Sequence, residues 1–234
     1  MRFPALNALF AVALAGGTEE RILFEDDFRN LENWRLEGTK KVSVEHGVMR
    51  ILCDGSRQGG VGCMAFCRKD FPDGIAVEYD LLVHESNGLI ITFVAMQGLN
   101  GEDAIADFPP RKGEFKDYTG DDCPLGSYHV SVSRYDDEGN HTGVSNWRRN
   151  PGLHLMAQGE DRCERIGRKY HIRIEKEGPC CALFVDGRPG GCFVDPQELP
   201  GAIPTEGKIG FRAIGSKVVA EVSRFRVLRL APKS

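Results

Sequence analysis

The sequence lacks a long apolar segment, a marked excess of one charge and a sustained helical period. Its 30 Lys and Arg residues nearly balance 34 Asp and Glu residues, giving a formal net charge of -4. This balance carries no polyanion-binding signature, so no nucleic acid partner is expected. Acidic polysaccharide stays open, because a local arginine cluster can bind it without changing the total. After residue 15 no segment is long and apolar enough to cross a membrane, so no membrane partner is expected.

Metal-binding motifs are also missing. The sequence has no paired Cys-x-x-Cys and no contiguous acidic loop of the EF-hand type, which argues against a zinc cage and a calcium hand. We therefore expect no cofactor, and a structural calcium ion enters only by analogy with other sandwich proteins. An even count of cysteines suggests disulfides in an exported chain, whereas in a reduced chain they would be buried small hydrophobes. The eight are Cys53, Cys63, Cys67, Cys123, Cys163, Cys180, Cys181 and Cys192.

The N-terminus resembles an export signal. Arg2 precedes an apolar run over residues 3–15 that ends in Ala-Leu-Ala, a typical cleavage pattern. This predicts a signal peptide at 1–15, a single domain at 16–234 and a secreted or periplasmic protein. The alternative is a buried N-terminal strand or helix in a cytoplasmic protein, since one charge is few for a signal and Asn7 interrupts the run. In a eukaryotic secretory pathway, Asn140 would be a glycosylation acceptor.

Short segments of alternating polarity follow, separated by turn residues. The 28 glycines and 12 prolines exceed what a helical bundle would tolerate. Strands at this spacing predict an all-β, lectin-like jelly-roll sandwich of two antiparallel sheets, of a size that one domain can reach. The expected strands cover residues 41–53, 62–67, 75–83, 89–96, 128–135, 153–158, 170–176, 182–185, 208–214 and 218–230.

One long segment, residues 98–125, has no period of either kind. A loop of this length inside a compact domain is usually functional or disordered. Its aromatic residues Phe108, Phe115 and Tyr118 argue against disorder. We therefore expect a functional loop, to which Glu102 and Asp103 also belong.

Two of the expected strands carry polar and ring side chains where a core strand would carry aliphatic ones. In 128–135, valines alternate with polar and ring residues, and 153–158 repeats the pattern. Amides, guanidinium groups and aromatic faces suit sugar hydroxyls and rings, although an alternating strand often marks only a solvated face. Trp147 is equally suited to a core anchor. The candidate residues are His129, Ser131, Ser133, Tyr135, His154 and Gln158, with Asn146, Trp147 and Arg148 between the strands.

A series of short motifs resembles the YesU-like family over residues 23–230. They are residues 62–67 (Gly-Cys-Met-Ala-Phe-Cys), 71–74 (Phe-Pro-Asp-Gly), 101–103, 128–131 with Arg134 and Tyr135, 146–148, 152–155, 157–159 and 208–212. The resemblance implies a concanavalin-like jelly roll, catalogued mainly as a domain of unknown function and associated with bacterial breakdown of rhamnogalacturonan-type polysaccharides. It thus implies a polysaccharide or oligosaccharide partner and supplies no mechanism. The leader and the extra cysteines depart from the family and place an intracellular role in doubt.

The first functional hypothesis is an enzyme that cleaves a uronate-containing glycan by β-elimination. His129 or His154 would be the base, because imidazole titrates near neutral pH, and Tyr135 would be the acid. Arg148 with Gln158 would hold the sugar carboxylate. The other predicted substrate contacts are Arg134, Asn146, Trp147, Glu102, Asp103 and Tyr118.

Other mechanisms remain open at this point. Hydrolysis by Glu102 and Asp103 ranks lower, because adjacent residues on an extended loop point apart. A non-catalytic carbohydrate-binding protein would use the same face without a tuned titrating group, and a structural domain would touch no sugar. The enzymatic hypothesis requires the imidazoles of His129 and His154 to face one shared cleft.

Overall fold

The computed structural model describes residues 20–39, 41–55 and 61–231. The predicted signal peptide lies outside these ranges. Within them the chain forms thirteen strands, joined only by antiparallel pairings, and one short helix, α1 (Lys116–Thr119). No helix among these residues is long and apolar enough to span a membrane. The predicted all-β architecture of antiparallel sheets is confirmed.

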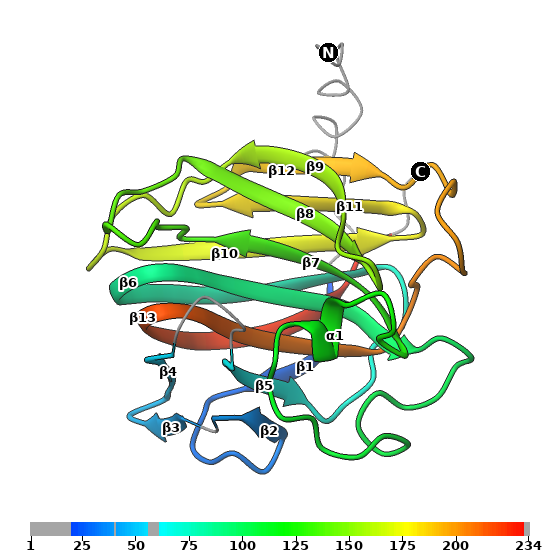
Figure 1. The fold of residues 1–234 in the computed structure, drawn as a ribbon, viewed down its shortest axis with the longest axis horizontal. Helices are drawn as coiled ribbons and strands as arrows, with labels where there is room; N and C mark the ends of the chain where they lie inside the picture. Colours follow the sequence, from blue (N-terminus) through cyan, green and yellow to red (C-terminus); the bar gives the residue numbers. More distant parts are fainter. Residues whose placement is uncertain (1–19, 40, 56–60, 232–234) are drawn as a thin grey trace.

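Two long strands, β6 (Ile75–Gly98) and β13 (Lys208–Arg229), run through both layers of the sandwich (Figure 1). The β10 sheet contains β12 (Arg188–Val194), β11 (Cys180–Val185), β10 (Lys169–Glu177), the first half of β6 and the second half of β13. Along the far edge of β13 it adds β4 (Val48–Cys53) with β3 (Val42–Glu45), and then β1 (Arg21–Asp26).

The β7 sheet uses the other halves of the two long strands. Its order is β9 (His154–Glu160), β8 (Val144–Asn150), β7 (Leu125–Val132), β6, β13, β5 (Cys63–Cys67) and β2 (Trp34–Gly38). Where β6 and β13 pass between layers, Gly88 pairs with Gly215. A Cβ on Gly88 would lie 2.2 Å from the carbonyl oxygen of Ile214, so the crossing needs a residue without a side chain.

The main core fills the space between the sheets. Trp34, Tyr79, Phe211 and Phe225 form a group of contacting rings there, and Phe211 and Tyr79 meet edge to face with centroids 4.9 Å apart. These side chains come from β2, β6 and both halves of β13, so the aromatic group ties the two layers together.

A second core lies on the outer side of the β7 sheet, beneath the long loop predicted from residues 98–125. Tyr118 of α1 packs on Phe66 and Phe93 of the sheet, with ring centroids 5.9 and 6.5 Å away. The carboxylate of Glu37, whose side chain is fully buried, accepts two hydrogen bonds from Arg111 at 2.8 and 3.2 Å. The loop is therefore an integral layer that covers part of the sheet.

The edges of the two sheets meet at β9 and β12. Side chains of Ser145, Trp147 and Arg162 donate hydrogen bonds to three successive carbonyl groups of β12. A Cβ on Gly159 would lie only 1.7 Å from the carbonyl oxygen of Gly190. These hydrogen bonds satisfy carbonyl groups of the edge strand β12 that another chain could otherwise pair with.

The cysteines form no disulfide in this structure. All eight lie in the described ranges as free thiols, and only Cys180 and Cys192 are partly exposed. The other six are buried, and burial raises the pKa of the Cys63 thiol to about 12. They therefore contribute to the packing as small hydrophobes.

Candidate functional site

The solvent-facing side of β7, β8 and β9 brings together several of the predicted site residues. Ser131 pairs with Asn146, and Asn146 pairs with Gln158 on the next strand. One row along, His129 pairs with Arg148. Paired residues of antiparallel strands point to the same side of a sheet, so these side chains share one face. We call it the β7–β9 face.

Three polar side chains are linked along one row of this face. The amide of Asn146 lies 3.0 Å from Nε2 of Gln158 and 2.8 Å from Nη1 of Arg134. Turned with its oxygen toward Arg134, the amide accepts a hydrogen bond from the guanidinium group, and its nitrogen then faces the amide of Gln158. Arg134 also donates to the carbonyl of Val144 at 2.9 Å. These contacts fix the orientation of three hydrogen-bonding groups from three chain segments.

Arg148 provides a second guanidinium group on the same face. Its Nη1 donates to the carbonyl oxygen of Leu153 at 2.6 Å. Among the residues that the structure describes, no carboxylate forms an ion pair with it, and partial burial lowers its pKa without an opposing acid. Beside it Leu155 is 49% exposed. The face therefore carries a partly desolvated cation next to apolar surface.

His129 points to the same side of the sheet but lies beneath the long loop. It is 2% exposed, with its ring centroid 4.8 Å from that of Phe93 and 6.3 Å from that of Phe115. Its Nδ1 lies 2.9 Å from Nδ2 of Asn150. Burial, helped by the positive charge of Arg148, lowers the pKa of His129 to about 3. The imidazole is thus a neutral packing group that a ligand on this face cannot reach.

His154 is on the other side of the sheet. It pairs with Arg149, whereas its neighbour Leu155 pairs with Arg148. Because successive residues of a strand alternate, His154 faces away from Arg148 and from His129. The prediction that both imidazoles face one cleft is therefore wrong.

The predicted aromatic contacts also serve the interior. Trp147 is fully buried, with its ring centroid 5.6 Å from that of Phe193, so it is a core anchor. Tyr118 is fully buried, and its hydroxyl donates to Oε2 of Glu37 at 3.1 Å. Tyr135 is 6% exposed, and its hydroxyl donates to the carbonyl of Glu164, so the phenol predicted as the acid is engaged outside the face.

Glu102 and Asp103 organise the long loop. Glu102 is exposed to solvent in part and accepts a hydrogen bond from the backbone N–H of Asn100 at 3.0 Å. Asp103 accepts from Nζ of Lys208 at 2.6 Å and from the backbone N–H of Ile105 at 2.7 Å. Although burial opposes ionisation, these donors lower the pKa of Asp103 to about 2. Both carboxylates thus have structural partners.

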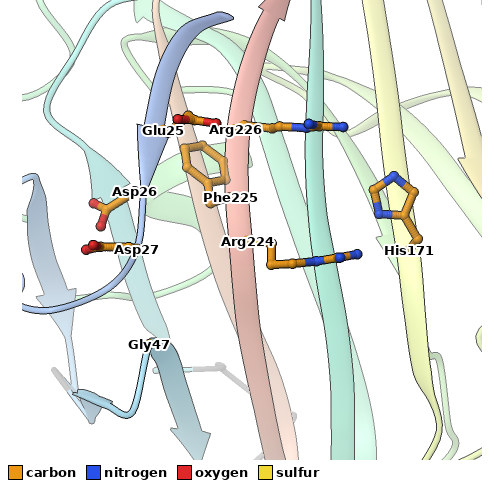
Figure 2. Close-up of a pocket in the computed structure, with 8 residues that line it drawn as sticks. All are labelled: Glu25, Asp26, Asp27, Gly47, His171, Arg224, Phe225 and Arg226. Carbon is orange, nitrogen blue, oxygen red and sulfur yellow. The ribbon is translucent and has the colours of Figure 1, made fainter.

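A pocket of about 540 Å³ lies on the opposite side of the molecule, and sequence reasoning missed it. Figure 2 shows Arg224 and Arg226 of β13 extending toward His171 of β10, with Asp26 and Asp27 on the far side of β1. A signal was present: charged residues alternate at 224 and 226 of one strand, and at 78 and 80 of its neighbour. In the described ranges, no group of three His, Cys, Asp or Glu side chains is placed to hold a metal ion.

Residues 22–227 match DUF1961, a domain of unknown function. The chain is 28% identical over 189 residues to the uncharacterized protein YesU of Bacillus subtilis (strain 168), covering 78% of this chain and 83% of that protein.

Solved structures with a similar fold include a Bacillus subtilis protein of unknown function with a galectin-like fold, with a TM-score of 0.80 and 24% identity over 92% of this chain and 99% of that one. A carbohydrate-binding module, CBM66 of Bacillus subtilis, has a TM-score of 0.54 at 15% identity, covering 85% and 97% of the two chains. An endo-β-1,3-glucanase of Pyrococcus furiosus has a TM-score of 0.61 at 12% identity, covering 92% and 96%. At these identities the likeness establishes the jelly-roll fold.

Proposed function

Since the chain belongs to the family of DUF1961, a domain of unknown function, we propose that it is a carbohydrate-binding protein whose ligand contacts the β7–β9 face. The sequence resemblance to the YesU-like family is confirmed by the match to YesU itself. The association with rhamnogalacturonan-type polysaccharides remains part of the proposal.

One observation carries this proposal: the side chains of Arg134, Asn146 and Gln158 lie together on the outer side of the sheet, where Gln158 is exposed and Asn146 is 6% exposed, with Arg148 one row away. Planar amide and guanidinium groups present paired hydrogen-bonding atoms, which suits the adjacent hydroxyl groups of a sugar ring. Because their mutual contacts already fix their orientation, less conformational entropy is lost when a ligand binds.

The structural relatives support the proposal at the level of the fold. Two of them are, by their names, a carbohydrate-binding module and an endo-β-1,3-glucanase. A fold hosts many functions, so the side chains of the face, more than the structural relatives, support sugar binding.

Binding without cleavage fits the geometry better than β-elimination. An elimination at this face needs a base within hydrogen-bonding reach of the sugar. His129 is covered by Phe93 and Phe115, and His154 faces the other side of the sheet. Among the described residues, the two imidazoles predicted as bases are therefore out of reach of a ligand on this face.

An acidic sugar is the ligand class that we propose. Arg148 has no carboxylate partner among the described residues, and a guanidinium group can bind a carboxylate through two parallel hydrogen bonds. A uronate carboxylate would restore the charge pairing that Arg148 lacks. Action outside the cytoplasm is likewise a proposal, based on the sequence of residues 1–15.

The test is calorimetric titration with an oligogalacturonate, with its methyl-esterified form as the ligand control. We expect binding of the acid form that weakens roughly tenfold or more in Arg148→Gln and in Gln158→Ala, because a hydrogen bond to a charged group contributes about 1.5–3 kcal/mol. The matched control is Arg168→Gln, which removes a half-exposed guanidinium paired with Asp186 and should bind normally. Equal affinity in all three variants would refute the site. Release of an unsaturated uronate would refute binding without cleavage.

A further inference from the structure

The pocket on the outer face of the β10 sheet is built from four segments that are distant in the sequence. It is lined by the end of β1, the turn between β3 and β4, β10 and the second half of β13. Its volume of about 540 Å³ is within the range of pockets that hold small ligands. It belongs to the opposite sheet from the β7–β9 face, so it is a separate site.

Two buried carboxylates fix the cationic wall of this pocket. Arg224 donates through Nε and Nη2 to Asp80 at 2.7 and 2.9 Å, and Arg226 donates through Nε to Glu78 at 2.7 Å. His171 lies 3.1 Å from Asp80 through Nδ1. Although burial opposes ionisation, hydrogen bonds from Arg173 and Arg226 lower the pKa of Glu78, and those from Arg224 and His171 lower the pKa of Asp80. The wall is therefore rigid, and its charge is already compensated.

A bulge in β13 brings the two guanidinium groups side by side. The pairing of β13 with β6 shifts between Ser223 and Arg226, and Arg224 has a positive φ of 51°. Residues other than glycine rarely adopt this backbone conformation. Phe225 between them is buried in the core, so Arg224 and Arg226 both extend over β6 toward His171 (Figure 2).

The opposite wall supplies hydrogen-bond acceptors. Glu25 and Asp27 are exposed at the end of β1, and Gly47 in the turn between β3 and β4 leaves the space beside them unfilled by a side chain. The guanidinium N–H donors and these carboxylate acceptors thus line opposite ends of the pocket, with Phe225 between them (Figure 2). The buried carboxylates neutralise the arginines, so an anion gains little here, whereas a ring bearing several hydroxyl groups can satisfy donors and acceptors together.

We propose that this pocket is a second carbohydrate site, which takes a neutral sugar unit. This proposal rests on the proposed function because both take carbohydrate as the ligand, but the two sites lie in different places. With one site on each sheet, a single chain bridges two glycan strands or two parts of one strand, and binding at both sites strengthens the attachment without new contacts.

The test is NMR of the 15N-labelled protein with glucose, galactose, xylose and maltose, each at 20 mM. We expect at least one of these neutral sugars to shift the backbone amides of Arg224, Phe225, Arg226 and Gly47. Arg224→Gln and Glu25→Gln should each weaken that binding about tenfold. The matched control is Arg50→Gln, which removes a half-exposed guanidinium paired with Glu221 on the same outer face but outside the pocket, and it should bind normally.

Outcomes for the two sites are separable. Arg148→Gln should leave the pocket shifts unchanged, and Arg224→Gln should leave oligogalacturonate binding unchanged. No shift of the pocket amides with any of the four sugars overturns this inference and leaves the β7–β9 proposal standing. Shifts that persist in Glu25→Gln, a variant that disturbs no described ion pair, also overturn it. Pocket binding without any oligogalacturonate binding supports the inference and refutes the proposed function.

Discussion

The buried imidazole of His129 predicts a specific dependence of stability on pH. In the unfolded chain it titrates at its ordinary pKa of 6.5, and in the folded protein burial lowers that pKa to about 3. The unfolded state therefore binds the extra proton first as the pH falls. The stability contributed by the neutral ring is fully present above pH 6.5 and is lost progressively between pH 6.5 and 3. At 1.36 kcal/mol per pH unit, about 2 kcal/mol is lost by pH 5.

Urea unfolding at pH 7.5, 6.0 and 5.0 measures this loss. The comparison is with His129→Gln, which keeps a neutral acceptor near Asn150 and has no proton to gain. The native protein should lose about 2 kcal/mol more than the variant between pH 7.5 and pH 5. His46→Gln is the control, since that imidazole is 90% exposed, and it should follow the native protein. Parallel curves for the native protein and His129→Gln would show that the ring is accessible to protons and would contradict its exclusion from the ligand face.

Three further predictions concern the parts that hold the fold together. Glu37→Gln leaves the guanidinium group of Arg111 beneath the long loop without its fully buried anion, so thermal and denaturant unfolding should show a loss of about 3–5 kcal/mol. Gly159→Ala places a methyl group against the carbonyl oxygen of Gly190 in β12 and should lower the free energy of unfolding by about 1–3 kcal/mol in the same assays. Gly126→Ala is the control and should be tolerated, because the nearest neighbour of its Cβ would lie 3.5 Å away. A thiol reagent should modify Cys180 and Cys192 in the native protein and the other six cysteines only after unfolding; fast labelling of all eight would contradict the packing.

The alternation of polar and apolar residues predicts the strands and much of the β7–β9 face. Because side chains of a strand alternate strictly, Asn146 and Arg148 fall on one side, and Gln158 joins them through the pairing of β8 with β9. The same rule places Trp147 on the inner side, so its burial was also implied by its position between two outward residues.

The sequence could not show which outward residues the long loop covers. His129 and Arg148 have the same orientation, yet only His129 lies under Phe115. The loop is held by Arg111 and Glu37, which are 74 residues apart, and no local pattern specifies that pairing. The covered part of the face thus depends on a tertiary contact. For this reason the sequence did not show that His129 is inaccessible, whereas it did place Arg148, Asn146 and Gln158 on one face.

The backbone amides of β7, β8 and β9 provide the most direct test of the account. In a 15N-labelled sample titrated with oligogalacturonate, we expect the shifts to concentrate on residues 131–134, 144–148 and 155–158 and to need roughly tenfold more ligand in Arg148→Gln. Shifts confined to other strands, or none at all across a panel of acidic oligosaccharides, would contradict the claim that this face is where the protein meets its glycan.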